Sequence, residues 1–157
     1  MFKLDSQLAQ DTVILGRFPL CLVLLSRDAN YPWCILVPQR QDVREIFHLT
    51  EEDRLQLMCE SSHLAEVMAD LFVPDKMNIA ALGNMVPQLH IHHVARLKAD
   101  GAWPQPIWGV KPAKSYADAE LRERAASLRS ALAGVEFEPI ESLDDLPEGD
   151  FEDRTNV

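Results

Sequence analysis

The run QLHIHHVARL, at residues 88–97, is the feature that most restricts the fold, because two kinds of side chain alternate along it. In a β-strand, successive side chains point to opposite faces. One face of this run would carry Leu89, Ile91, His93 and Ala95, and the other Gln88, His90, His92 and Val94. The sequence therefore predicts a strand that buries the first face and presents an amide and two imidazoles on the second.

Four other short runs, rich in β-branched and aliphatic residues, also predict strands. They are TVILGR, LCLVLLS, WCILVPQ and KMNIAAL, at residues 12–17, 20–26, 33–39 and 76–82. Helical spacing of apolar residues predicts a long helix at residues 50–72 and a C-terminal helix at residues 117–133. Because most connections between strands are short, antiparallel pairing is favoured. The expected fold is α+β, with an antiparallel sheet of about five strands, one long helix packed on it and a C-terminal helix.

The long helix has sequence signals at both of its ends. Thr50 followed by Asp53 matches a capping box, and Pro74 cannot continue the helix. The residues expected to form its buried stripe are Leu55, Met58, Cys59, Ser62, Leu64, Ala65, Met68 and Leu71. The chain has three cysteines in apolar segments without a CxxC pair, and we expect all three to be buried small hydrophobic residues. These are Cys21, Cys34 and Cys59.

The formal net charge of −10 at pH 7 is unevenly distributed. Residues 135–157 hold nine acidic residues and one basic residue, whereas the rest of the chain is close to neutral. We therefore expect one domain at residues 1–134 and an acidic, solvated tail at residues 135–157. Neither part has the basic stripe that nucleic-acid binding requires. No apolar run reaches the ~20 residues of a membrane-spanning helix, so we expect a cytoplasmic protein without a membrane partner.

The paired imidazoles of His90 and His92 allow three interpretations. They could share a metal ion, but no Cys, Asp or Glu lies between Lys76 and Asp100 to complete such a site. They could be structural histidines on a polar face. They could also serve nucleophilic catalysis, because neutral imidazole is a good nucleophile near pH 7 and a phosphorylated imidazole nitrogen is a good leaving group. One ring would attack, and the other would hold phosphate oxygens or protonate the leaving group.

The run QLHIHHVAR, together with the order of the surrounding elements, resembles the signature of the histidine triad (HIT) family, His-φ-His-φ-His-φ-φ with φ apolar. The chain is most similar to the bacterial hydrolase-like branch, and the resemblance covers roughly residues 10–110. It implies a HIT-like half-barrel sheet and a homodimer. It also implies cleavage at the α-phosphate of a nucleotide or dinucleotide through a nucleotidyl-histidine intermediate. We expect no cofactor and no metal ligands among the site residues, and the sequence leaves open whether a divalent cation assists.

Residue by residue, the resemblance makes His90 the nucleophile and places His92 near the leaving group. Asn84 matches a position that contacts phosphate. Gln88 matches the first histidine of the motif, and its backbone carbonyl would accept a hydrogen bond from His90 and fix the tautomer of that ring. His93 occupies an apolar position and would pack at the edge of the sheet or donate to a backbone carbonyl.

The chain departs from the family pattern at the signature itself. Gln88 replaces the first histidine, and its amide could donate one hydrogen bond to the phosphate of a substrate but cannot carry a proton or a charge. Met85 stands where many members have Ser or Thr, Leu82 where many have a polar residue, and the loop before the signature is short. These departures favour a second hypothesis, a nucleotide-binding or scaffold protein with little catalysis. A metal-dependent hydrolase is a third.

Other candidate residues come from the first strands and from the loop after the signature. Ser26 and Asp28, at the end of the second predicted strand, are candidates for contacts with the nucleoside. Trp108 in the loop GAWPQPIWGVKP could cover a base or pack against a partner subunit. Arg96 could assist an anionic substrate, but pairing with a structural acid is the favoured interpretation.

Overall fold

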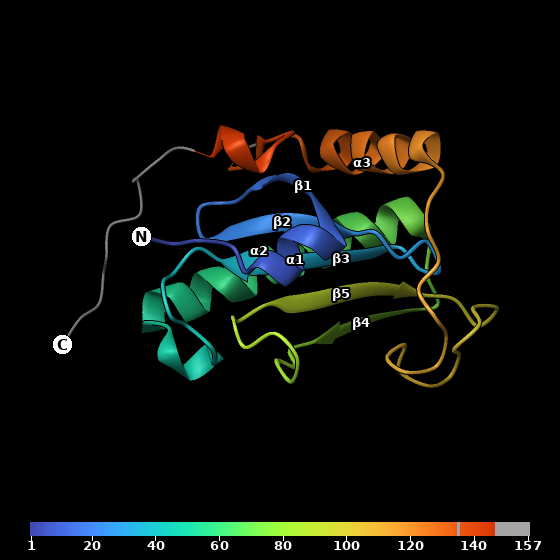
Figure 1. Ribbon diagram of the computed structural model, residues 1–157, viewed down its shortest axis with the longest axis horizontal. Helices are drawn as coiled ribbons and strands as arrows, with labels where there is room; N and C mark the ends of the chain where they lie inside the picture. The colour runs from blue at the N-terminus through green and yellow to red at the C-terminus, as the bar shows by residue number, and fades with distance from the viewer. Residues whose placement is uncertain (135, 147–157) are drawn as a thin grey trace.

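The computed structural model of the chain describes residues 1–134 and 136–146. In chain order the helices and strands are α1 (Ser6–Asp11), β1 (Thr12–Arg17), β2 (Cys21–Ser26), β3 (Trp33–Pro38), α2 (Glu51–Phe72), β4 (Lys76–Ala80), β5 (Ile91–Arg96), α3 (Asp118–Leu132) and β6 (Glu138–Pro139). The strands form one antiparallel sheet in the order β4-β5-β3-β2-β1-β6 (Figure 1). The predicted α+β fold is confirmed, and β6 extends the predicted sheet.

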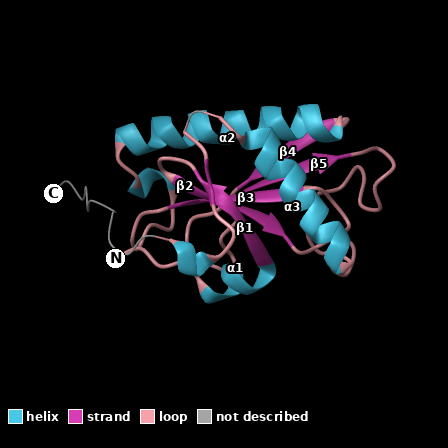
Figure 2. Ribbon diagram, turned by 90° about the horizontal axis from the view of Figure 1, so that it is seen from above, coloured by secondary structure: helices cyan, strands magenta, loops and turns pink. Residues whose placement is uncertain are grey.

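Helices cover both faces of the sheet (Figure 2). α2 and α3 lie on one face, and the short helix α1 lies on the other. The sequence did not predict α1, because six residues are too few to show a helical period. Its first turn is held by Asp5, whose Oδ1 accepts a hydrogen bond from the backbone N–H of Gln7 at 2.8 Å. None of the helices in the described part of the chain is long and apolar enough to cross a membrane.

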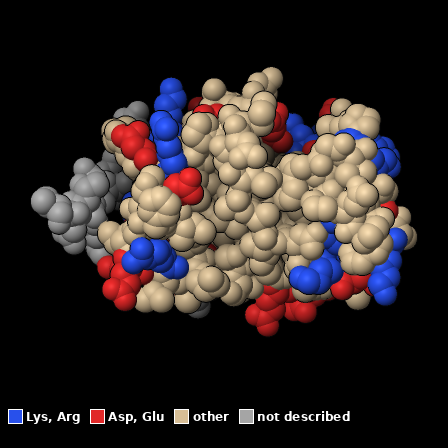
Figure 3. Space-filling view, turned by 90° about the horizontal axis from the view of Figure 1, so that it is seen from below, with Lys and Arg blue, Asp and Glu red and all other residues tan. Residues whose placement is uncertain are grey.

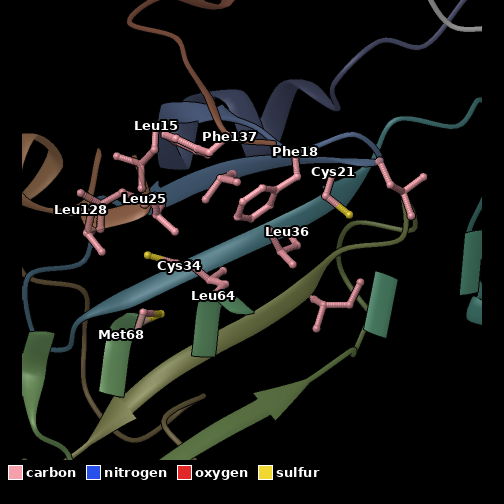
Figure 4. Close-up of a cluster of buried hydrophobic side chains, with 14 of the residues drawn as sticks. Leu15, Phe18, Cys21, Leu25, Cys34, Leu36, Leu64, Met68, Leu128 and Phe137 are labelled. Atoms are coloured by element: carbon pink, nitrogen blue, oxygen red, sulfur yellow. The ribbon is translucent and has the colours of Figure 1, made fainter. Parts of the chain in front are cut away.

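The larger core fills the space between the sheet and helices α2 and α3. Figure 4 shows Leu64 and Met68 of α2 packed toward Cys34 and Leu36 of β3, with Leu128 of α3 near Leu25 of β2 in the same cluster. A second cluster lies on the opposite face of the sheet. It contains Leu8, Ile14, Leu22, Leu24, Ile35, Val37 and Ile140. The sheet is therefore buried on both faces, which agrees with the nearly continuous apolar sequences of β2 and β3.

The predicted buried stripe of α2 was largely wrong. The residues of α2 that are buried are Asp53, Leu57, Glu60, Ser61, Leu64 and Met68. Leu55 and Met58 are 65% and 66% exposed, and Cys59 is exposed as well. The helix turns its polar residues Glu60 and Ser61 inward because each has a buried hydrogen-bond partner, and this rotates the apolar residues of the predicted stripe outward.

Glu60 is the clearest example of a polar residue that specifies this orientation. Its two carboxylate oxygens accept hydrogen bonds from the backbone N–H groups of Leu20 and Cys21, at 2.8 and 2.9 Å. A buried carboxylate is tolerated when such bonds replace its hydration. The same carboxylate raises the pKa of the Cys21 thiol, after burial as the main cause.

The start of α2 follows half of the predicted capping box. The Thr50 side chain accepts a hydrogen bond from the backbone N–H of Asp53 at 3.1 Å, as predicted. The Asp53 carboxylate instead forms a bidentate ion pair with Arg40, at 2.7 and 2.8 Å. This pair joins the start of α2 to the end of β3.

The segment that follows α3 returns to the sheet. α3 ends with Ala133 as its C-cap residue, next to Gly134, for which the sequence predicted the C-cap. Within the predicted acidic tail, β6 pairs with β1, and Phe137 and Ile140 are buried. Phe137 packs directly over Gly16, where a β-carbon would lie 2.5 Å from its ring. The rest of the predicted tail, residues 147–157, lies outside the described residues.

The two faces of β5 agree with the alternation predicted from the sequence. Ile91 and Ala95 belong to the larger core under α2, and His93 points to the same side. His92 points to the other face, opposite Ile35 of β3 and Ala80 of β4 in the register of the sheet. The strand itself begins at Ile91 rather than at Gln88, so Gln88 and His90 lie in the segment that leads into β5.

Candidate active site

A cavity of about 400 Å³ opens on the face of the sheet opposite α2. His90 and His92 lie on its wall, with their ring centroids 4.8 Å apart and their planes at 77°. The other lining residues are Leu8, Asp11, Thr12, Ser26, Trp33, Ile35, Leu82, Gly83, Asn84, Met85, Val86 and Trp108. The two imidazoles thus lie in a mostly apolar cavity with a few other polar side chains, which is the usual composition of a small-molecule site.

A local hydrogen bond fixes the tautomer of His90. Its Nδ1 lies 2.7 Å from the backbone carbonyl oxygen of Gln88. A carbonyl oxygen only accepts, so Nδ1 carries the proton and the Nε2 of the neutral ring keeps its lone pair. The predicted contact between the Gln88 carbonyl and the ring of His90 is confirmed, and it leaves a nucleophilic nitrogen available to a ligand.

His92 has the opposite tautomer. The indole Nε1–H of Trp33 donates to His92 Nδ1 at 3.0 Å. This nitrogen must therefore be unprotonated, and the ring proton of neutral His92 lies on Nε2. Burial, together with the neighbouring rings of His90 and His93, lowers the pKa of His92 from 6.5 to about 3. The site thus pairs one imidazole that offers a lone pair with another that offers an N–H.

The side chain of Gln88 is engaged outside the cavity. Its Oε1 accepts from the backbone N–H of Asp5 at 2.9 Å, and its Nε2 donates to the carbonyl of Lys3 at 2.9 Å. Gln88, which replaces the first histidine of the motif, therefore connects the segment before α1 to the segment that carries His90 and His92. It does not line the cavity.

The remaining predicted site residues lie around the two histidines. Asn84 lines the cavity, and no described residue forms a hydrogen bond with its side chain. Ser26 and Trp108 line this cavity and also a second one of about 410 Å³ beside it. Asp28 lines only the second cavity, where its Oδ1 accepts from Asn30 and from the backbone N–H of Lys114 at 3.1 Å. The structure thus gathers every predicted site residue except Gln88 along these two cavities.

Trp33 is a site residue that the sequence did not predict. It binds His92 through its indole nitrogen and meets Trp108 edge to face, with ring centroids 6.1 Å apart. Trp108 in turn contacts the ring of His92, with centroids 5.1 Å apart. A tryptophan at the start of a strand usually indicates packing, and only the pairing of β3 with β5 brings it beside the signature. Leu8 and Asp11 of α1 were also missed, along with the helix itself.

His93 and Arg96 have structural partners. The Nδ1–H of His93 donates to the Ile91 carbonyl at 3.1 Å, and its Nε2 accepts from the Ser61 hydroxyl at 2.7 Å. The predicted bond to a backbone carbonyl is confirmed, but β5 is an inner strand, so the predicted place at the sheet edge is wrong. Arg96 is buried and forms a bidentate ion pair with Asp100, at 2.8 and 3.1 Å, as the favoured interpretation predicted.

The sequence as a whole matches one family of proteins. A family model described as HIT domain matches residues 7–99, which is more than half of the chain. The chain belongs to the HIT domain family. HIT domain proteins are generally nucleotide hydrolases or transferases. No curated protein matches the chain.

Solved structures of bacterial histidine triad proteins are similar to this HIT domain over most of its length. One from Marinobacter aquaeolei VT8 is 49% identical, with a TM-score of 0.82, and the alignment covers 84% of this chain and 96% of that one. One from Bradyrhizobium japonicum is 45% identical, with a TM-score of 0.81 and coverage of 83% and 97%. One from Sinorhizobium meliloti 1021 is 40% identical, with a TM-score of 0.81 and coverage of 84% and 98%.

Proposed function

We propose that this HIT domain is a nucleotide hydrolase or nucleotidyl transferase in which His90 forms a nucleotidyl-histidine intermediate. The observation that carries the proposal is the hydrogen bond from His90 Nδ1 to the Gln88 carbonyl, because it leaves the lone pair on Nε2 of a ring that lines the cavity beside a second imidazole. Family membership supports a nucleotide as the ligand. The proposed steps use protein side chains and no cofactor.

The reaction would proceed in two displacements. In the first, His90 Nε2 attacks the α-phosphorus, a P–N bond forms, and the bond from phosphorus to the leaving group breaks. The positive charge that forms on the His90 ring is stabilised by the Gln88 carbonyl. In the second, water or the hydroxyl of another acceptor attacks the phosphorus, the P–N bond breaks, the electron pair returns to Nε2, and the proton of the attacking hydroxyl passes to solvent.

The walls of the cavity suit the remaining parts of a nucleotide. Leu8, Ile35 and Val86 provide apolar surface for a base. Asn84 lies in the loop next to the histidines, and its amide can donate to a phosphate oxygen. The Ser26 hydroxyl, at the junction of the two cavities, suits a ribose hydroxyl. Trp108 would close the opposite side of the site.

A covalent adduct is the direct test of this function. The protein would be mixed with the p-nitrophenyl ester of adenosine monophosphate or with diadenosine triphosphate, quenched in acid and digested for mass spectrometry. We expect the mass of an adenylyl group on His90, release of adenosine monophosphate, and loss of both in His90→Asn. His63→Asn, which removes an exposed imidazole from α2, is the matched control. Turnover that persists in His90→Asn would contradict the proposed role of His90.

A second candidate function is nucleotide binding with little catalysis. It is favoured by the commitment of the Gln88 amide to Lys3 and Asp5, and by the exposed Met85, which is 92% exposed and offers no hydroxyl to a phosphate. Tight binding of adenosine monophosphate in calorimetry, with neither adduct nor turnover in the wild type, would identify this function instead.

We further propose that the chain acts as a homodimer through the face around β4. β4 is an edge strand, and Ile79 on it is 50% exposed. Leu55 and Met58 of α2 are largely exposed as well. Seen from below, the side on which β4 ends the sheet, the middle of the surface is largely uncharged, and Lys, Arg, Asp and Glu gather at the margins (Figure 3). A second copy fits this face because β4 can pair with β4 of the other copy about a twofold axis, and the exposed apolar residues of both copies would then be buried.

Light scattering after gel filtration tests the proposed dimer. We expect a dimer for the wild type and a monomer for the double variant Leu55→Lys with Met58→Lys, because two buried charges would oppose association. Ala126→Lys, on the exposed side of α3, is the control and should stay dimeric. A monomeric wild type at micromolar concentration would contradict the proposal. The cytoplasmic location remains a prediction that fractionation of cells would check.

A further inference from the structure

The indole of Trp33 determines what His92 is able to donate. An indole nitrogen is a donor only, so the bond at 3.0 Å to His92 Nδ1 requires a lone pair on that nitrogen. The imidazolium form of His92 would carry protons on both nitrogens and would place two N–H groups against each other. Forming it would break this bond and leave the indole N–H without its acceptor, which is unfavourable for a buried donor.

The surroundings of His92 oppose the imidazolium form further. The ring is only 6% exposed and contacts the rings of His90 and Trp108 edge to face. A neutral imidazole N–H donates a hydrogen bond well, but it does not release its proton near neutral pH. His92 can therefore stabilise a negatively charged oxygen on the leaving group without transferring a proton to it.

No other described residue that lines the first cavity can give the leaving group the proton that His92 retains. Besides the two histidines, the titratable side chain there is Asp11, whose carboxylate accepts a hydrogen bond from Gln7 Nε2 at 2.8 Å. The Ser26 hydroxyl oxygen accepts from the backbone N–H of Asp28 at 3.2 Å. Gln88, in the place of the first motif histidine, offers an amide and is occupied elsewhere. Among the described residues that line this cavity, none supplies a proton to a leaving group, so the proposed attack by His90 would proceed without a general acid.

The second cavity supplies an independent observation about the leaving group. It adjoins the first one at Asp11, Ser26, Trp33 and Trp108. Its charged lining residues are three cations, Arg27, Lys111 and Lys114, and two acids, Asp11 and Asp28. None of the three forms an ion pair with a residue in the described part of the chain. Asp28 accepts hydrogen bonds from Asn30 and from the backbone N–H of Lys114, and Asp11 accepts one from Gln7. The second cavity therefore carries one more positive than negative formal charge, which favours an anion that leaves the first cavity past Trp108.

On these two observations we propose that the substrates of this site are nucleotides whose leaving group is a weakly basic oxygen anion, such as a phosphate or a nucleoside phosphate. In this proposal Trp33 is the positioning residue that selects such substrates over phosphoramidates. The proposal rests on the proposed function. When His90 attacks, the P–O bond breaks and its electron pair stays on the departing oxygen, which leaves as an anion hydrogen-bonded to His92 Nε2–H. An amine would have to leave as a far more basic anion or receive a proton, and the site does not supply one.

A series of adenosine monophosphate esters and amides tests this selectivity. Because a positioned general acid typically contributes about 10²–10⁴-fold, we expect the wild type to cleave the p-nitrophenyl ester at least ~100-fold faster, in kcat/KM, than an alkyl phosphoramidate. Among substituted phenyl esters, the rate should fall steeply as the phenol becomes more basic. Trp33→Phe should flatten this dependence, because His92 Nδ1 is then able to take a proton. Trp108 contacts the His92 ring without a hydrogen bond. Its replacement in Trp108→Phe should therefore keep the steep dependence of the rate on the basicity of the phenol.

Two further measurements keep the selectivity separate from the proposed function. Nitrogen NMR of His92 should show a single neutral tautomer, with the proton on Nε2, from pH 5 to pH 8 in the wild type and not in Trp33→Phe. Lys111→Met with Lys114→Met should raise KM for diadenosine triphosphate several-fold and leave KM for the p-nitrophenyl ester unchanged. A protein that forms the His90 adduct but cleaves phosphoramidates as fast as nitrophenyl esters would overturn this proposal alone. Absence of any adduct would overturn the proposed function, and the NMR result would then decide the role of Trp33.

Discussion

The Ser61 hydroxyl on α2 donates to His93 Nε2 on β5 at 2.7 Å, through the buried layer of the domain. His93 follows His92 directly, so this bond ties the back of the candidate active-site strand to the long helix. Burial lowers the pKa of His93 to about 4, and the ring is neutral at physiological pH. The third histidine of the run HIHH, at residues 90–93, thus holds the strand in place rather than acting in the cavity.

We predict that Ser61→Ala destabilises the protein by about 1–3 kcal/mol, because it leaves the buried Nε2 of His93 without a donor. Urea unfolding at pH 7 measures the change in the free energy of unfolding. Ser62→Ala removes the exposed neighbouring hydroxyl on the same helix and should change this free energy by less than about 0.5 kcal/mol. Equal effects of the two substitutions would show that the Ser61–His93 bond contributes nothing to stability.

The pKa values of His92 and His93 predict how stability depends on pH. Both are lowered in the folded chain from 6.5, to about 3 and about 4. Below pH 6.5 the unfolded chain binds protons on these rings and the folded chain does not, so stability falls as the pH drops. Each ring contributes up to about 1.4 kcal/mol per pH unit until the pH reaches its folded pKa. Asp100, whose pKa the Arg96 ion pair lowers to about 2, acts in the same direction only below about pH 4.

Urea unfolding at pH 7, 6 and 5 measures this slope. Between pH 6 and pH 5 the free energy of unfolding should fall by about 1 kcal/mol less in His92→Asn than in the wild type, because the substitution removes the contribution of one imidazole. The exposed histidines, including His63, are present in both proteins and cancel in the comparison. An unchanged slope in His92→Asn would mean that His92 is protonated in the folded protein.

The buried ion pair of Arg96 and Asp100 predicts a large stability effect. The Arg96 guanidinium is 1% exposed, lies between the rings of Tyr31 and Trp103 and also donates to Asn78 at 2.8 Å. Asp100→Ala leaves this charge unpaired, and we expect a loss of about 3–5 kcal/mol in thermal or chemical unfolding. Asp70→Ala, at an exposed position of α2, should change stability by less than about 0.5 kcal/mol. A loss below about 1 kcal/mol in Asp100→Ala would indicate that water replaces the carboxylate.

The sequence predicts the parts of this protein that depend on neighbouring residues. The alternation along β5, the N-cap at Thr50 and the bond from His90 to the Gln88 carbonyl each join residues at most three positions apart. The face of α2 could not be predicted from apolar spacing, because its orientation depends on Glu60 and Ser61. Their partners lie about forty residues earlier and thirty-two residues later in the chain.

The same distinction separates the predicted site residues from those that were missed. His90 and His92 are recognisable from their spacing alone. Trp33 lies 59 positions before His92 and becomes part of the site only because β3 pairs with β5. No pattern among its neighbours in the sequence indicates this role. The Gln88 side chain was expected to face a phosphate, but its two partners at Lys3 and Asp5 are more than 80 positions away.

The contacts of Gln88 lead to a prediction that separates binding from chemistry. Gln88→Ala removes both hydrogen bonds to the segment before α1, and α1 contributes Leu8 and Asp11 to the wall of the cavity. The backbone carbonyl that orients His90 stays in place. We therefore expect KM for the p-nitrophenyl ester of adenosine monophosphate to rise by about fivefold to tenfold, which corresponds to roughly 1–1.4 kcal/mol of binding, with kcat nearly unchanged.

Steady-state kinetics of Gln88→Ala beside Gln105→Ala measures this difference. Gln105 is exposed and lines neither cavity, so its substitution should leave both constants unchanged. Gln88→His should behave like Gln88→Ala, because an imidazole cannot form both bonds that the amide forms. A fall in kcat with unchanged KM in Gln88→Ala would instead place the amide of Gln88 on the reacting phosphate in the transition state, as the resemblance to the first motif histidine predicted.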